Sequence, residues 1–557
     1  MNKAVIYQIF TRLCCNSGGQ NIPSGSIQEN GSGKLNSYTP IVLDNIRQMG
    51  VTHIWFTGLI AHASCTSYKK FRIPLSHPET VKGVAGSPYA IRDYYDIDPD
   101  LAESVPDRMA EFQALVDRVH SADMKFIMDF VPNHVAREYH SIKKPRGVKD
   151  LGQDDDVSMH FSPQNNFYYM PGQTLGGEVD WGDYKEYPAR ATGNDQFTST
   201  PSYSDWYETV KLNYGVDYTG GGRHCFDPVP DTWHKMLHIL LYWASKGVDA
   251  FRCDMAEMVP VDFWHWAIRQ VKQSHPEIQF IAEIYNPGSY SSYVDWGGFD
   301  YIYDKVGLYD TLRAVIESRQ SATAITRCWQ QNGGNGPHML HFMENHDEQR
   351  IASRFFGENA QKGRPAMIVS ALMDNCPVMV YAGQEVGEPG MDQEGFSGLD
   401  GRTTIFDYWS PDTLNRLYND GKWNDERLTT NERELRHFYS TLLNICNKEN
   451  CIRNGKFFDL MYVNPQSSDF NPHRQYAFMR SDGKDAILVV TNFTDQPLYT
   501  AVNIPQHAFD YMELKEKDGV TVKELLSGQT FKANIHPDTP IHVTVPAQSG
   551  VILKWQK

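Results

Sequence analysis

Short, nearly continuous apolar runs recur along the chain and alternate with stretches whose apolar residues have helical spacing. Such runs are typical of parallel strands that helices cover on both faces. Eight of them predict strands, at residues 4–10, 51–57, 125–130, 248–253, 279–284, 299–303, 339–343 and 377–381. Amphipathic stretches between the runs, such as 106–122 and 231–246, predict helices. The pattern predicts an α/β fold, a (β/α)8 TIM barrel, with an open doubly wound sheet as the alternative.

Two regions interrupt this alternation. Residues 135–206 are rich in Gly, Asp, Asn and Tyr and are too long for a simple loop, so they predict a subdomain inserted after strand three. From residue 455 the helical pattern stops, and short alternating runs separated by turns such as Asp482-Gly483 predict a C-terminal all-β sandwich. The predicted domains are the barrel (1–134 and 207–454), the insert (135–206) and the sandwich (455–557).

Composition narrows the range of partners and locations. Among 557 residues, 52 are Lys or Arg and 68 are Asp or Glu, which gives a net charge of −16 and predicts no nucleic-acid partner. Because no apolar stretch approaches about 18 residues, we expect no membrane span. The nine scattered cysteines include no CxxC pair and indicate free thiols in a reducing compartment. With no signal peptide visible, the sequence predicts a cytoplasmic location.

Polar residues gather where the predicted strands end. Three strands are followed by, or end in, a carboxylate, namely Asp254, Glu283 and Asp347. Each one alone is readily explained as a helix N-cap. Together they indicate chemistry, because one end of a barrel would not collect like charges for stability. Arg252 precedes Asp254 by two residues, so both side chains lie on the same face of their strand and the arginine favours the ionised carboxylate.

Two kinds of enzyme use such a set. Glycoside hydrolysis needs one carboxylate as nucleophile and one carboxylic acid to protonate the leaving oxygen. A metal hydrolase would use a cluster of neutral histidines, such as HxH at a strand end, and the sequence has none there. The sequence therefore favours glycoside hydrolysis.

Four segments, at 129–134, 251–254, 282–283 and 344–347, resemble in this order the signature regions of the α-amylase family of glycosidases, glycoside hydrolase family 13. Residues 87–94 and 380–385 agree with that pattern, so the resemblance extends over nearly the whole chain. It implies a (β/α)8 barrel with a subdomain inserted after strand three and a C-terminal β-sandwich. The substrate it implies is an α-glucan oligosaccharide or polysaccharide.

The resemblance also implies catalytic roles. Asp254 matches the nucleophile, Glu283 the general acid/base, and Asp347 the third carboxylate, which stabilises the transition state. We expect retention of anomeric configuration through a covalent intermediate, with the carboxyl groups of Asp254 and Glu283 about 5–5.5 Å apart.

Substrate-binding roles follow in the same way. His134 and His346 match histidines that bind sugar hydroxyls, and Tyr89 matches the ring that stacks on that sugar. Arg252 matches the arginine that orients the nucleophile. Asp129 matches an acidic residue that we interpret as structural, a partner for Arg252.

The chain also departs from the family pattern. Glu257 and Met258 stand where many members have Lys-His, so acceptor preference is left open. The lysine at position 211 is similar to the pattern of the neopullulanase and cyclomaltodextrinase group. Asn133 matches a calcium ligand of many amylases, but no partner ligands are identifiable in the insert. We therefore expect no required cofactor, with calcium at Asn133 as the alternative.

The sequence thus predicts an enzyme that hydrolyses α-1,4 bonds of maltodextrins or starch. A 4-α-glucanotransferase, which shares the covalent intermediate, and an exo-acting α-glucosidase or cyclomaltodextrinase are alternatives. A sugar-binding protein without catalysis is the alternative from another class, and the presence of all three carboxylates speaks against it.

Overall fold

A computed structural model describes residues 3–391, 396 and 398–557. Eight parallel strands form a closed barrel, and each predicted strand corresponds to one of them. The strands are β1 (Val5–Phe10), β2 (His53–Thr57), β5 (Lys125–Phe130), β12 (Ala250–Cys253), β13 (Gln279–Ala282), β14 (Tyr301–Tyr303), β15 (Met339–Phe342) and β16 (Val378–Tyr381). The barrel is confirmed, and closure through the β1–β16 pair excludes the open sheet.

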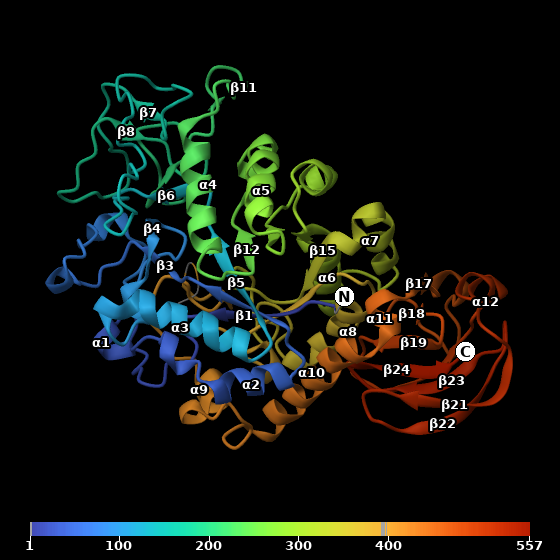
Figure 1. Cartoon of the computed structure of the whole chain (residues 1–557). Coiled ribbons are helices and arrows are strands. Elements are labelled where there is room, and N and C mark those ends of the chain that lie inside the picture. The colour runs from blue at the N-terminus through green and yellow to red at the C-terminus, as the bar shows by residue number, and fades with distance from the viewer. Residues whose placement is uncertain (1–2, 392–395, 397) are drawn as a thin grey trace.

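Helices surround the barrel (Figure 1). The longer ones are α2 (Pro40–Gln48), α3 (Arg108–Ser121), α4 (Asp231–Ala244), α5 (Val261–Ser274), α6 (Asp310–Ile316), α7 (Ala324–Asn332), α8 (Arg364–Leu372), α9 (Asp412–Tyr418) and α10 (Thr430–Lys448). Local sequence sets where they begin. Thr429 and Glu432 bond each other's backbone N–H groups at the start of α10, and Thr39 accepts from the N–H of Val42 at the start of α2.

The barrel interior is filled by side chains that alternate along the strands. One buried cluster contains Ile6, Trp55, Ile127, Ala250, Ile281, Tyr303, Leu340, Phe342 and Met379. Because strand side chains alternate between faces, Arg252, two residues after Ala250, also lies on the interior side, nearer the C-terminal end of β12. The apolar cluster thus forms the floor beneath the strand ends at which the predicted site residues lie.

A region of short strands lies between β5 and α4 (Figure 1). Its pairs are β6 (His134–Ala136) with β9 (Thr209–Lys211), β7 (Tyr169–Met170) with β8 (Ala189–Arg190), and β10 (Val216–Asp217) with β11 (Arg223–His224). It has its own apolar cluster, which includes Tyr168, Met170 and Trp181. The hairpin of β3 (Ile60–His62) and β4 (Ile91–Ile97) lies between β2 and α3. The domain boundaries themselves stay a prediction.

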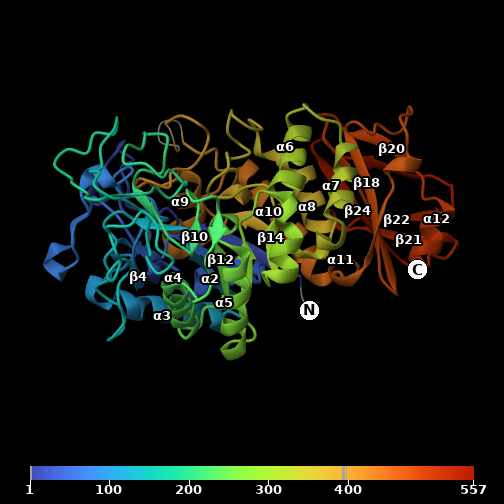
Figure 2. The ribbon, with the colours of Figure 1, turned by 90° about the horizontal axis from the view of Figure 1, so that it is seen from above.

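The C-terminal part is built of β-strands, as predicted, with one short α-helix, α12 (Gln506–Met512). Its main sheet has the order β17 (Lys456–Asp459), β18 (Gln475–Ser481), β19 (Asp485–Asn492), β24 (Ser549–Gln556), β21 (Lys517–Glu524) and β22 (Thr530–Ile535). β20 (Leu498–Val502) pairs with β23 (Ile541–Val545). Figures 1 and 2 both place these strands at the side of the barrel remote from the insert.

One buried arginine joins the C-terminal domain to the barrel. Arg480 on β18 donates to the carbonyls of Met373 at 2.6 Å, Gly455 at 2.9 Å and Cys451 at 3.3 Å. We expect Arg480→Met to lower the free energy of unfolding by about 2–3 kcal/mol, because these buried carbonyls lose a charged donor. Thermal unfolding checks this, with the exposed Arg427→Met as control. Equal melting temperatures for the two variants would contradict it.

Candidate active site

A buried guanidinium lies at the centre of the site. Arg252 Nη1 is 2.8 Å from Asp254 Oδ1, and Nη2 is 2.9 Å from Glu283 Oε2. Asp129 Oδ1 lies 3.4 Å from Nη1, and Nε donates to the hydroxyl of Tyr303 at 3.0 Å. These residues lie at or next to the ends of four adjacent strands, β12, β13, β5 and β14. The expectations that Arg252 and Asp254 share a face and that Asp129 partners Arg252 are confirmed.

Aromatic rings enclose this charge cluster. The Arg252 guanidinium lies 5.1–5.6 Å from the ring centres of Trp55, Tyr89 and Tyr303, and its side chain is fully buried. Burial and the neighbouring Glu283 raise the pKa of Asp254 well above its usual value, while Arg252 acts in the opposite direction. Burial also strengthens every charge interaction in the cluster.

Both oxygens of Glu283 are held by donors. Its Oε2 accepts the N–H of Met255 at 2.8 Å, and its Oε1 accepts the Tyr285 hydroxyl at 2.5 Å. Met255 has a positive φ of 44°, a backbone conformation that non-glycine residues rarely adopt. Sequence reasoning missed Tyr285. The available signal was its position two residues after Glu283, since side chains so spaced along an extended run share a side.

One of the two residues that depart from the family pattern after Asp254 supports the same loop. Glu257 accepts the N–H groups of Tyr285 and Asn286, both at 3.1 Å. Its carboxylate therefore holds the segment that follows Glu283.

Asp347 follows β15 and lies beside His346. His346 Nε2 is 3.0 Å from Asp347 Oδ2 and 2.5 Å from the Tyr89 hydroxyl, while its Nδ1 is 2.8 Å from the amide nitrogen of Gln8. Burial alone would raise the pKa of Asp347, but His346, Arg252 and Arg402 together hold that pKa below its usual value. Gln8, on β1, is thus a partner of His346 that sequence reasoning missed.

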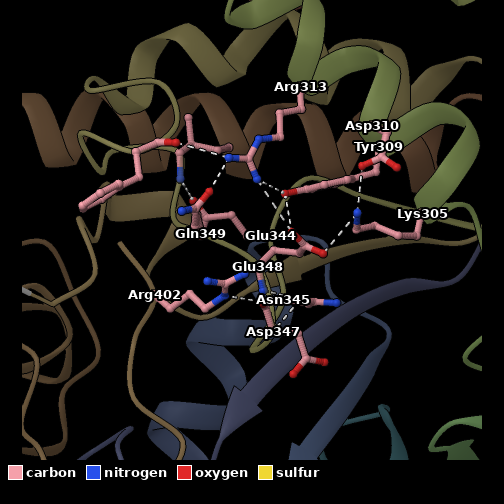
Figure 3. A network of polar contacts seen from close by, with 12 residues as sticks. Lys305, Tyr309, Asp310, Arg313, Glu344, Asn345, Asp347, Glu348, Gln349 and Arg402 are labelled. Carbon is pink, nitrogen blue, oxygen red and sulfur yellow. Dashed lines mark hydrogen bonds and ion pairs between the residues drawn. The ribbon is translucent and has the colours of Figure 1, made fainter. Parts of the chain in front are cut away.

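A polar network fixes the backbone that carries Asp347 (Figure 3). The side-chain oxygen of Asn345 accepts the N–H groups of Asp347 at 2.9 Å and Glu348 at 3.0 Å. Arg402 donates to the carbonyl of Asp347 at 2.6 Å. Figure 3 shows the carboxylate of Asp347 pointing away from the rest of this network, and the Asp347 side chain is 30% exposed.

His134 follows β5 and faces the insert. Its Nδ1 is 3.1 Å from the side-chain nitrogen of Asn133, and its ring lies 5.3 Å from that of Trp206. Burial and, secondarily, Lys211 lower the pKa of His134 to about 3, so its ring is neutral near neutral pH. The side-chain oxygen of Asn133, the candidate calcium ligand, accepts a hydrogen bond from the Lys211 ammonium.

This contact tests the calcium alternative. An ammonium group bonded to the oxygen of Asn133 competes with any cation for that ligand. Within the described ranges, no group of three or more His, Cys, Asp or Glu side chains could hold a metal ion. The ammonium group on the oxygen of Asn133 therefore does not fit a calcium ion bound there, and the absence of a required cofactor stays a prediction.

A cleft of about 600 Å³ brings most of the predicted residues together. Tyr89, His134, Asp254, Glu283 and Asp347 line it. The predicted binding residues Arg252 and His346 lie behind this surface with fully buried side chains. Five further aromatic rings also line the cleft, namely Tyr203, Trp206, Tyr285, Phe396 and Phe406.

The strand ends of this (β/α)8 barrel bring the carboxyl groups of Asp254 and Glu283 onto Arg252, and Asp347 lines the same cleft. This is the arrangement of a barrel glycosidase. Comparison with known protein families agrees. Residues 8–442 match the α-amylase catalytic domain, and residues 466–556 match the α-amylase C-terminal all-β domain. The chain belongs to the α-amylase family.

Several relatives cover most of the chain at low identity. It is 22% identical over 549 residues to an α-amylase of Streptomyces lividans. The matched region covers 92% of this chain but only 55% of that relative. It is 21% identical to a cyclomaltodextrinase of a Bacillus species, covering 88% of this chain and 72% of the relative. A maltogenic α-amylase of Thermotoga neapolitana has a similar fold, with a TM-score of 0.64, 19% identity and coverage of 100% and 99%.

The raised pKa of Asp254 predicts how the protein's stability depends on pH. In the unfolded chain the pKa of an aspartate is near 3.9, and in the folded protein the pKa of Asp254 is higher. The free energy of unfolding therefore falls as the pH rises from the unfolded-state pKa to the folded-state pKa. Asp254→Asn removes this penalty, while Glu283 and Asp129 still compensate Arg252. We expect the variant to melt above the wild type at pH 7.

The gain should shrink as the pH is lowered toward about 4. Differential scanning calorimetry across this range checks it, with the exposed Asp420→Asn as control. A variant that melts below the wild type at pH 7 would contradict the prediction.

Proposed function

We propose that the protein is a retaining glycoside hydrolase that cleaves α-1,4-glucosidic bonds of maltodextrins or starch. One observation carries the proposal: a single buried guanidinium binds both Asp254 and Glu283 at the floor of an open cleft. Retention requires two carboxyls close together, one as nucleophile and one as acid. Asp347, on the same cleft, supplies the third carboxylate.

In the proposed reaction, a carboxylate oxygen of Asp254 attacks the anomeric carbon while Glu283 gives its proton to the departing glycosidic oxygen. The C–O bond breaks, and a covalent glycosyl–aspartate ester forms. Glu283, now ionised, takes a proton from water as that water attacks the same carbon and releases Asp254. Because Oε2 of Glu283 forms an ion pair with Arg252 and accepts the N–H of Met255, Oε1 is the oxygen that we assign to the proton transfer.

The shape of the cleft supports a neutral chain of several sugars as substrate. A second hollow of about 550 Å³ adjoins the cleft and shares Lys82, Tyr203, Phe396 and Phe406 with it. Aromatic faces along such a groove suit stacking against sugar rings. A structurally similar α-amylase of Geobacillus thermoleovorans has been solved with acarbose, at 17% identity and a TM-score of 0.61.

The alternatives share this chemistry. A 4-α-glucanotransferase differs in that a sugar hydroxyl instead of water attacks the intermediate. An exo-acting α-glucosidase or cyclomaltodextrinase differs in which bonds of the chain reach Asp254. All of these would use the same carboxylates, so product analysis separates them.

We also infer a cytoplasmic location. All nine cysteines are free thiols, seven of them buried, which suits a reducing compartment. No helix in the described residues has the length and apolarity to cross a membrane. We expect no nucleic-acid partner, given the net charge of −16.

Product analysis with maltoheptaose tests the proposal. We expect the wild type to release shorter oligosaccharides with retained configuration, and Asp254→Asn to be slower by about 10³-fold or more, because the nucleophile is lost. Chromatography over time gives the product sizes, and NMR gives the anomeric form first released. Products longer than the substrate would identify a glucanotransferase, and glucose or maltose alone an exo-acting enzyme. An unchanged rate in Asp254→Asn would refute the assignment of the nucleophile.

Tyr285 supplies a test of the acid. Tyr285→Phe removes the donor on Oε1 of Glu283, and we expect kcat/KM for maltoheptaose to fall by about tenfold. For α-maltosyl fluoride, whose leaving group needs little protonation, the fall should stay within about twofold. Glu283→Gln should show the same contrast more strongly. Equal losses on both substrates in Tyr285→Phe would mean that Tyr285 does not act through the acid.

A further inference from the structure

A second buried cation lies at the junction of the barrel and the insert. The side chain of Lys211, on β9, is 2% exposed. Its ammonium donates to the side-chain oxygen of Asn133 and to the carbonyl of Met258 at 3.2 Å, and it lies 2.7 Å from Asp195 Oδ1. The ring of Tyr218 lies 5.6 Å away.

The ligands of this ammonium come from three separate segments. Asn133 follows barrel strand β5, Met258 lies in the segment after β12, and Asp195 belongs to the insert. Each gives an oxygen atom: one amide, one backbone carbonyl and one carboxylate. Oxygen atoms of these kinds are what hard divalent cations such as calcium take as ligands, and here they surround a lysine nitrogen.

The same contact sets the orientation of a residue on the cleft. With its oxygen turned to Lys211, Asn133 presents its NH₂ group to the carbonyl of Gly193 at 2.8 Å and to His134 Nδ1 at 3.1 Å. Nδ1 of His134 then accepts, so the ring proton is carried by the other nitrogen. Lys211 therefore reaches His134 through a single side chain.

We propose that the Lys211 ammonium takes the place of a structural divalent cation at this junction, so that the protein needs no calcium there, and that Lys211 is a positioning residue for His134. The statement about metal stands on the contacts of Lys211 alone. The statement about His134 also rests on the proposed function.

The metal part is tested on the wild-type protein. Thermal unfolding is measured after treatment with EDTA and after addition of calcium chloride, and calcium chloride is titrated calorimetrically into the chelated protein. We expect equal melting temperatures and no binding heat. A melting temperature that EDTA lowers and calcium restores would overturn the proposal. This test does not depend on activity or on any variant.

The positioning part needs a matched pair of variants. Lys211→Met removes the charge, and Lys235→Met serves as control. Lys235 also binds the region between β5 and α4, through the carbonyl of Asp150 and the side chain of Asn166, both at 2.8 Å. We expect Lys211→Met to lower kcat/KM for maltoheptaose by about tenfold or more, and Lys235→Met to leave it near wild type.

A double-mutant cycle separates positioning from general loss of stability. If Lys211 acts through His134, Lys211→Met should add little to the loss already caused by His134→Gln. If the losses of kcat/KM in the two single variants multiply in the double variant, Lys211 does not act through His134. A Lys211→Met variant as active as the control would also overturn the positioning role. A wild type that is inactive on maltoheptaose would instead count against the proposed function, and the calcium experiment would remain decisive for the metal. If Lys211→Met failed to fold, the calcium experiment on the wild type would still decide the metal part of the proposal.

Discussion

A buried positive charge that must be matched by negative ones is the constraint on which the active site depends. Arg252 is enclosed by aromatic rings and forms ion pairs with Asp254 and Glu283, with Asp129 slightly farther away. Without it, carboxylates on adjacent strand ends would repel one another in a medium of low polarity. With it, the two carboxyl groups can be buried together on one guanidinium. The apolar barrel floor, which includes Trp55 and Tyr303, keeps water away from this cluster.

The insert is joined to the barrel by the same kind of interaction. Lys211 is buried and is matched by Asp195 and by neutral oxygens, and it connects the end of β5 to the segment after β12. Both cations cost desolvation free energy, and both have partners from several segments. The protein thus uses two fixed internal charges to position the two sides of one cleft: the carboxyl pair on the barrel side and His134 on the insert side.

Much of the fold was predictable because its signals are local. Strand-like runs and amphipathic helices follow periods of two and 3.6 residues, and these need no knowledge of distant segments. The pairing of Arg252 with Asp254 was also predictable, since two residues on one strand share a face whatever the rest of the chain does. The three carboxylates could be placed at one end of the barrel because parallel strands share a direction.

The sequence by itself therefore determined the barrel, the all-β C-terminal part and the shared location of Asp254, Glu283 and Asp347. Only the tertiary structure decided which groups touch them. Gln8 meets His346 because barrel closure brings β1 next to β16 and so within one strand of β15, and Lys211 meets Asn133 across 78 residues. Contacts of this kind depend on strand register, closure and the course of the long insert. These follow from packing of the whole chain, so no local pattern of residues encodes them.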